Sequence, residues 1–236
     1  LCLTGAIAAD VAFGFWLRWP GFTAGAGAAS PPSSGAEDVS AIEAANPSEP
    51  GSYTFGTLTY GSGTDQRRPE YGPGVDLQTE AVDASPFVSV EGWRSQLRES
   101  YWGFGPEQFP RNARVWQPEG EGPFPLVLIV HGNDNMTEAA DAGYGYLGEL
   151  LASQGYIAAS VDECFFGSYV AAGGLGGEND GRAWLLLKHL ELWRDWNQTE
   201  GNPFFGRVDL ERIALIGHSR GGEAVAHAAA FNNLRY

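Results

Sequence analysis

A serine flanked by glycines follows a short apolar run near the end of the sequence. The apolar residues 213–216 lead directly into Gly217-His218-Ser219-Arg220-Gly221-Gly222, and the alanine-rich residues 223–230 have the composition of a helix packed closely on a sheet. In a chain with 33 glycines a Gly-x-Ser-x-Gly match alone is weak evidence, but here strand, turn and helix follow in the required order. Small residues two positions before and after the serine permit a sharp, strained turn. The pattern predicts that the Ser219 hydroxyl projects over a sheet edge as a nucleophile; the alternative is a glycine-rich turn with an incidental serine.

A second motif follows an apolar run in the middle of the chain. Residues 125–130 are continuously apolar, as expected for a strand buried on both faces, and they end at His131-Gly132-Asn133. Acyl transfer needs two fixed N–H donors for the developing oxyanion, and one of them is normally the residue after the nucleophile. We therefore predict the backbone N–H groups of Arg220 and Asn133 as these donors. The simpler alternative is that His131 and Gly132 only end a strand.

The segment between the two motifs predicts a parallel sheet. Apolar residues at helical spacing over 144–151 end at Gly155, and residues 156–161 form the next predicted strand, which completes a βαβ unit. A further helix is expected to run to about Trp196, with Asn179 or Asp180 as its N-cap.

Together these segments resemble the α/β-hydrolase family, and within it the secreted esterases, polyester hydrolases and platelet-activating-factor acetylhydrolases. The resemblance rests on the strand into residues 131–133, on residues 147–162 and on the 217–222 motif. It implies the N-terminal part of an α/β-hydrolase sheet, mostly parallel with helices on both faces, in which residues 114–117 add an antiparallel strand. It also implies Ser219 as nucleophile and Arg220 and Asn133 as oxyanion donors. The residues expected to shape the turn and the loop are Gly217, His218, Gly221, Gly222, His131 and Gly132.

The sequence departs from this family after the nucleophile. The family order is Ser, then Asp or Glu, then His, yet of the four histidines only His227 follows Ser219, and no acidic residue follows Glu223. Eight residues along a helix place His227 roughly 12 Å away, outside proton-transfer reach. We expect a truncated sequence whose triad acid and histidine lie beyond Tyr236, so the fragment alone is expected to be inactive. The alternative is a pseudoenzyme that has lost its base.

The N-terminal residues differ in composition from the rest. Residues 1–22 form a hydrophobic segment, predicted as the end of a membrane helix or a signal remnant, and 23–51 read as a flexible linker before a hydrolase domain over 52–236. Asp10 would cost about 2.5 to 3.5 kcal/mol at the centre of a bilayer, which argues against a complete independent span. Residues 1–20 could attach the chain to a membrane, and we expect an extracytoplasmic protein, either anchored or secreted. A buried helix is the alternative.

Charge and motif content exclude several classes of function. The formal charge of −15 disfavours nucleic acid and anionic membrane surfaces as partners. The acidic residues Asp162, Glu163, Glu178 and Asp180 fit no metal-binding pattern and are predicted to be solvated loop carboxylates and a helix cap. We therefore predict neither a metal nor a cofactor.

These observations favour a serine hydrolase that cleaves carboxylic esters through an acyl-enzyme, with a small-molecule, lipid or polyester substrate. Peptidase or thioesterase chemistry stays open within the same class. The alternative from another class is a non-catalytic, membrane-tethered binding domain of the same fold.

Overall fold

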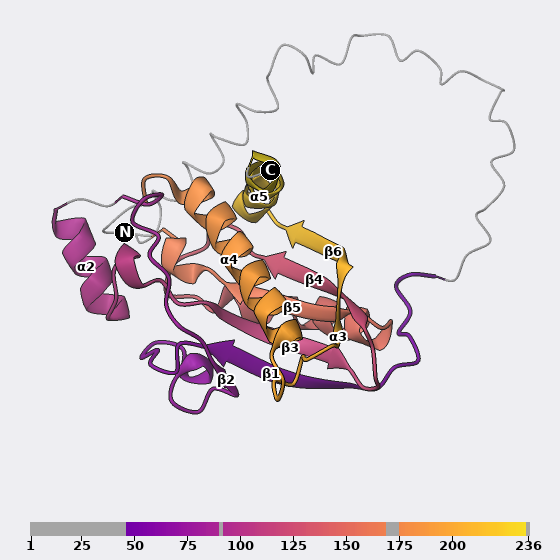
Figure 1. The fold of residues 1–236 in the computed structure, drawn as a ribbon. Coiled ribbons are helices and arrows are strands. Elements are labelled where there is room, and N and C mark those ends of the chain that lie inside the picture. Colours follow the sequence, from indigo (N-terminus) through magenta and orange to yellow (C-terminus); the bar gives the residue numbers. More distant parts are fainter. Residues whose placement is uncertain (1–45, 90–91, 169–174, 235–236) are drawn as a thin grey trace, which may run out of the picture. The chain divides into compact units, whose positions relative to one another are not determined.

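The computed structural model describes residues 46–89, 92–168 and 175–234, which form an α/β fold with a six-stranded mixed sheet and four α-helices (Figure 1). The strands are β1 Phe55–Gly61, β2 Leu77–Gln78, β3 Asn112–Pro118, β4 Phe124–Val130, β5 Ile157–Asp162 and β6 Val208–Gly217. The helices are α2 Trp93–Trp102, α3 Gly145–Ser153, α4 Glu178–Gln198 and α5 Arg220–Leu234. Short 3-10 turns are η2 Pro69–Tyr71, η3 Pro106–Gln108, η4 Ala140–Tyr144 and η5 Cys164–Phe166.

The strand order is β2-β1-β3-β5-β4-β6. β4 is parallel to both of its neighbours, β5 and β6, whereas β3 is antiparallel to β1 and to β5. The βαβ unit predicted from residues 125–161 is therefore confirmed, with α3 as its crossover helix. The sheet as a whole is mixed, because β3 runs opposite to its neighbours β1 and β5, whereas β2 is parallel to β1.

Helices cover both faces of the sheet. Successive side chains of β3 point to opposite faces: Val115 belongs to the same apolar cluster as Trp193 of α4, and Trp116 lies against Gly148 of α3. α5 packs beside α4, and Ala224 and Ala228 of α5 belong to that cluster (Figure 1). With both faces covered, β4 is almost fully buried, which explains its continuous apolar sequence.

The start of α4 differs from the prediction. Its N-cap is Gly177, in left-handed conformation and without a capping side chain, so neither Asn179 nor Asp180 is the cap. Both residues lie in the first turn, where their side chains contact Glu223 and His227 of α5. The side chains of Asn179 and Asp180, predicted to cap α4, thus connect α4 to α5.

The N-terminal predictions fall mostly outside the described residues. This is so for the hydrophobic segment 1–22 and for residues 23–45 of the predicted linker. Residues 46–51 lie against the end of α3, where Gln154 Nε2 donates to the carbonyl oxygens of Pro47 and Glu49. None of the helices in the described ranges has the length and apolar character needed to cross a membrane.

Candidate active site

Ser219 lies in a strained turn between β6, which ends at Gly217, and α5, which begins at Arg220. Its φ is 53°, and it is the one non-glycine residue with positive φ in the described part of the chain. Such a conformation is unfavourable for a residue with a Cβ, and it is often found at functional sites. Ser219 is exposed, and its hydroxyl forms no hydrogen bond with any other residue that the structure describes. The turn therefore leaves this oxygen accessible.

The glycine spacing around Ser219 has a direct steric cause. A Cβ atom at Gly217 would lie 2.2 Å from the Gly221 carbonyl oxygen, and a Cβ at Gly221 would lie 2.5 Å from the Val130 carbonyl oxygen. Both distances are far shorter than van der Waals contact, and backbone atoms cannot rotate away. Gly222 is less restricted, because its nearest contact would be 3.3 Å. The turn thus needs glycine two residues before and two residues after the serine.

The two sequence motifs meet at the same edge of the sheet. Val130 and Gly217, the last residues of β4 and β6, are partners in the parallel pairing, and the His218 N–H donates to the Val130 carbonyl at 3.1 Å. A Cβ added to Gly132 would lie 3.0 Å from the Ser219 Cβ. Because β5 and β6 lie on opposite sides of β4, the strand order reverses here, and such a reversal is where open α/β sheets bind ligands.

The two predicted oxyanion donors occupy this edge. Arg220 is the first residue of α5, where backbone N–H groups have no partner within the helix. No described residue accepts a hydrogen bond from the N–H of Arg220 or of Asn133. The Asn133 side chain is held in place by Ser168, through a 3.0 Å bond from Asn133 Nδ2 to Ser168 Oγ and another from the Ser168 N–H to Asn133 Oδ1. Two unpaired N–H groups beside an exposed serine oxygen are compatible with oxyanion binding.

His131 is buried and shapes the loop after β4. Its Nε2 accepts the Glu163 N–H at 3.0 Å, so the ring proton is on Nδ1, which donates to the Gly132 carbonyl at 2.8 Å. Burial lowers the pKa of His131 to about 4, which keeps the ring neutral. With both nitrogens occupied, His131 is not available as a base for Ser219.

His189 lies within α4, on the side that faces β1. It is fully buried, and its Nδ1 lies 2.7 Å from the Tyr60 hydroxyl. Burial lowers the pKa of His189 to about 3 and raises that of Tyr60 above its usual range. The pair joins α4 to β1 in the core of the fold.

No histidine in the described ranges forms a hydrogen bond with Ser219. His218 is exposed, and His227 pairs with Asp180 at 2.9 Å between Nδ1 and Oδ1. This part of the molecule therefore presents an exposed serine and two unpaired N–H groups, but no histidine in contact with that serine.

The prediction of solvated loop carboxylates is wrong for three of the four acidic residues. Asp162, Glu163 and Glu178 are buried, and only Asp180 is exposed. The buried carboxylates are paired with arginine: Asp162 lies 3.8 Å from Arg68 Nε, while Glu163 and Glu178 both contact Arg182. The signal available in the sequence was the i,i+4 spacing of Glu178 and Arg182 on one helix.

One group of potential metal ligands occurs among the described residues, formed by His131, Asp162 and Cys164, whose ligand atoms lie within 4.8 Å of one another. The His131 Nε2 lone pair already accepts the Glu163 N–H. Burial raises the pKa of the Cys164 thiol well above its usual range and that of Asp162 to about 7. With the His131 lone pair occupied and the Arg68 Nε 3.8 Å from the Asp162 carboxyl group, the three side chains do not present three free ligand atoms to a cation.

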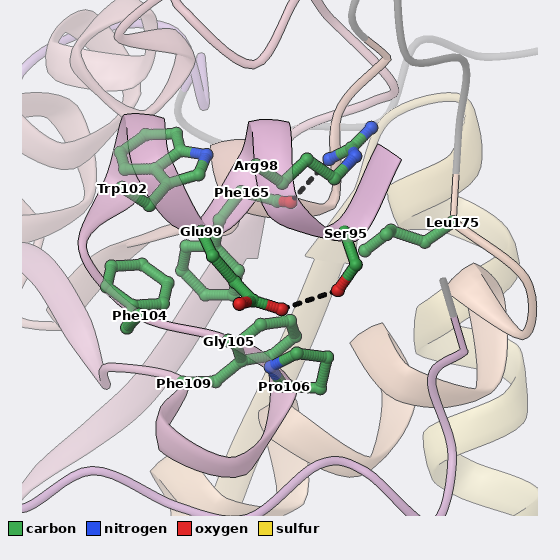
Figure 2. A pocket seen from close by; sticks show the side chains of 10 residues that line it. All are labelled: Ser95, Arg98, Glu99, Trp102, Phe104, Gly105, Pro106, Phe109, Phe165 and Leu175. Atoms are coloured by element: carbon green, nitrogen blue, oxygen red, sulfur yellow. Dashed lines mark hydrogen bonds between the residues drawn. The ribbon is translucent and has the colours of Figure 1, made fainter. Parts of the chain in front are cut away.

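A small cavity lies between α2 and the segments that contain η3 and η5. It holds about 20 Å³, its aromatic lining residues are Trp102, Phe104, Phe109 and Phe165, and neither Ser219 nor the two predicted donors line it (Figure 2). Arg98 spans its wall and donates to the Phe165 carbonyl at 3.1 Å. A space of this size accommodates about one water molecule, so this cavity is a packing feature and not a substrate site.

No protein-family model matches this chain, and no curated protein is similar enough in sequence to count as a relative.

The burial of His189 predicts a measurable pH dependence of folding. Its pKa is lower in the folded protein, about 3, than in the unfolded chain, so the stability it contributes is fully present above about pH 6.5 and is lost as the pH falls. Between about pH 7.5 and about pH 4.5 the free energy of unfolding of the wild type should fall, relative to His189→Gln, by about 2.5 kcal/mol. Urea titrations of both proteins at the two pH values measure this difference. The pH-dependent contributions of Asp162 and Glu163 to stability are present in both proteins and therefore cancel in it. Parallel pH profiles would show that His189 is not buried in its neutral form.

Proposed function

We propose that this chain carries the nucleophile of an α/β-hydrolase-type serine esterase, which cleaves carboxylic esters through an acyl-enzyme. The observation that carries the proposal is Ser219: an exposed serine at φ 53° between β6, which is parallel to β4, and the helix α5, directly beside Gly132. A glycine-flanked serine on such a turn is the nucleophile arrangement of that family.

In the proposed reaction the Ser219 oxygen attacks the acyl carbonyl carbon. The carbonyl oxygen becomes an anion and accepts hydrogen bonds from the N–H groups of Arg220 and Asn133. The bond between the acyl carbon and the alcohol oxygen then breaks, and the alcohol leaves with the proton that the Ser219 hydroxyl lost. Water then hydrolyses the acyl-enzyme and releases the acid. Proton transfer needs a histidine, oriented by a carboxylate, that the described residues do not supply to Ser219.

The substrate class proposed is a small-molecule, lipid or polyester ester. We also propose an extracytoplasmic location, anchored or secreted, with residues 1–20 as a means of membrane attachment. The formal charge of −15 disfavours nucleic acid as a partner.

Burst kinetics test this proposal. The protein expressed from its complete gene should release p-nitrophenol from p-nitrophenyl acetate in a rapid first phase of about one equivalent per active site, because acylation precedes a slower hydrolysis. Turnover without a burst, in pre-steady-state experiments with excess substrate that resolve acylation, would argue against a covalent intermediate that accumulates. Absence of any turnover across short and long acyl esters would argue against the esterase proposal.

A non-catalytic binding domain is the second candidate, and the observation that favours it is the lack of contact between Ser219 and any described histidine. The complete gene sequence discriminates the two. The esterase proposal requires an Asp or Glu and then a His, in this order after Ser219, at the ends of predicted strands. A full-length protein without this pair supports the binding role.

A further inference from the structure

A buried arginine on α4 joins two carboxylates beside the candidate active site. Arg182 is fully buried, its Nε lies 2.9 Å from Glu178 Oε1, and its Nη1 lies 3.1 Å from Glu163 Oε2. Glu178 begins α4, and Glu163 directly follows β5. Arg182 therefore links the start of α4 to the residue that follows β5. These two positions lie near the turn at Ser219 and the loop after β4.

One branch of this network reaches the turn after Ser219. Glu178 uses its second oxygen, Oε2, to pair with Arg220 Nη1 at 3.4 Å. Arg220 carries the first proposed oxyanion donor on its backbone. The Arg220 side chain is about half exposed, so the buried Glu178 is the fixed partner in this pair and restricts where Arg220 can lie.

The other branch reaches the loop after β4. The Glu163 carboxylate is held by Arg182, and the Glu163 N–H donates to His131 Nε2 at 3.0 Å. Through its Nδ1, His131 donates to the Gly132 carbonyl at 2.8 Å. A trans peptide group is planar, with its C=O and N–H pointing in opposite directions. Fixing the Gly132 carbonyl therefore fixes the direction of the Asn133 N–H, the second proposed donor.

Stability alone does not account for this network. Removing two carboxylates and a guanidinium from water is unfavourable, and apolar residues of similar volume often stabilise a core as well or better. Geometric control of the two donors is a consequence that apolar packing would not provide.

We propose that Arg182 is a positioning residue for the oxyanion site, which holds the Arg220 N–H through Glu178 and the Asn133 N–H through Glu163 and His131. This inference rests on the proposed esterase function. It predicts a defect in the transition state, because an oxyanion forms there and is absent from the bound substrate.

The test compares Arg182→Met and Arg182→Lys with Arg114→Met in the protein expressed from its complete gene. Arg114 is a matched control, because it also bridges two carboxylates, Glu70 and Asp141, from the centre of β3. Arg182→Met should lower kcat for p-nitrophenyl esters by about 10- to 100-fold with KM changed less than about threefold. Arg182→Lys, which retains the charge, should recover part of kcat, and Arg114→Met should keep the wild-type kcat.

The outcomes separate this inference from the proposed function. A wild type without ester turnover contradicts the esterase function itself. A wild type that turns over, with Arg182→Met and Arg114→Met alike in kcat, overturns the positioning role. If Arg182→Met does not fold, Glu178→Gln decides: it keeps an oxygen for Arg182 and weakens the hold on Arg220, so kcat should fall about 3- to 10-fold at constant KM. A wild-type kcat in that variant overturns the inference as well.

Discussion

Replacing Ser219 with alanine in the protein expressed from its complete gene should lower kcat for ester hydrolysis by about 10⁴- to 10⁶-fold. The change removes the oxygen that forms the acyl-enzyme, and the residual rate would come from substrate binding and the oxyanion donors alone. Alanine and serine both carry a Cβ, so the strain at φ 53° is unchanged and the fold should be retained. Release of p-nitrophenol measures the rate, and circular dichroism during heating checks the fold.

The matched control for this substitution is Ser95→Ala. Ser95 lies on the surface of α2, where its hydroxyl bonds to Glu99. The Ser95→Ala protein should hydrolyse esters at the wild-type rate. A Ser219→Ala protein that hydrolyses esters at the wild-type rate would show that Ser219 is not the nucleophile.

Gly221→Ala should strongly destabilise the contact between the turn and β4. Its Cβ would lie 2.5 Å from the Val130 carbonyl oxygen and 2.6 Å from that of His131, so β4 and the start of α5 would have to separate. We expect a loss of about 2 to 4 kcal/mol in the free energy of unfolding. Catalysis should also fail, because the same displacement moves Ser219 away from Gly132.

Gly56→Ala provides the comparison. Gly56 lies in β1, and a Cβ there would meet nothing within 4 Å, so its stability should change by less than about 0.5 kcal/mol. Denaturant titrations of both variants give the two values. Equal stability of Gly221→Ala and Gly56→Ala would show that β4 and the turn are not in the close contact described here.

Local sequence patterns were sufficient for the central strands and for the turn. The continuous apolar run that forms β4 has few alternatives to a strand covered on both faces, and the helical spacing that ends at Gly155 identifies α3. The glycines around Ser219 could also be predicted from local geometry, because a Cβ at these positions would clash within the turn or with the neighbouring strand. In each case the determining interactions are near in sequence or follow from parallel pairing.

The buried polar network could not be predicted in the same way. Asp162 is the last residue of β5 and Glu163 follows it directly, and a carboxylate at a strand end is usually solvated. Their burial depends on arginines from distant segments, Arg182 and Arg68, which only the tertiary fold brings to them. The pairing of His189 with Tyr60 likewise joins α4 to the first long strand. Sequence spacing shows none of these long-range partners.

Covalent labelling tests the central claim most directly. The protein expressed from its complete gene is treated with a fluorophosphonate, digested and analysed by mass spectrometry, with the Ser219→Ala variant treated in parallel. The geometry at Ser219 predicts one phosphonylated peptide, which contains Ser219, and no adduct in the variant. A folded protein without an adduct, or with its adduct on a different residue, would contradict the assignment of Ser219 as the nucleophile.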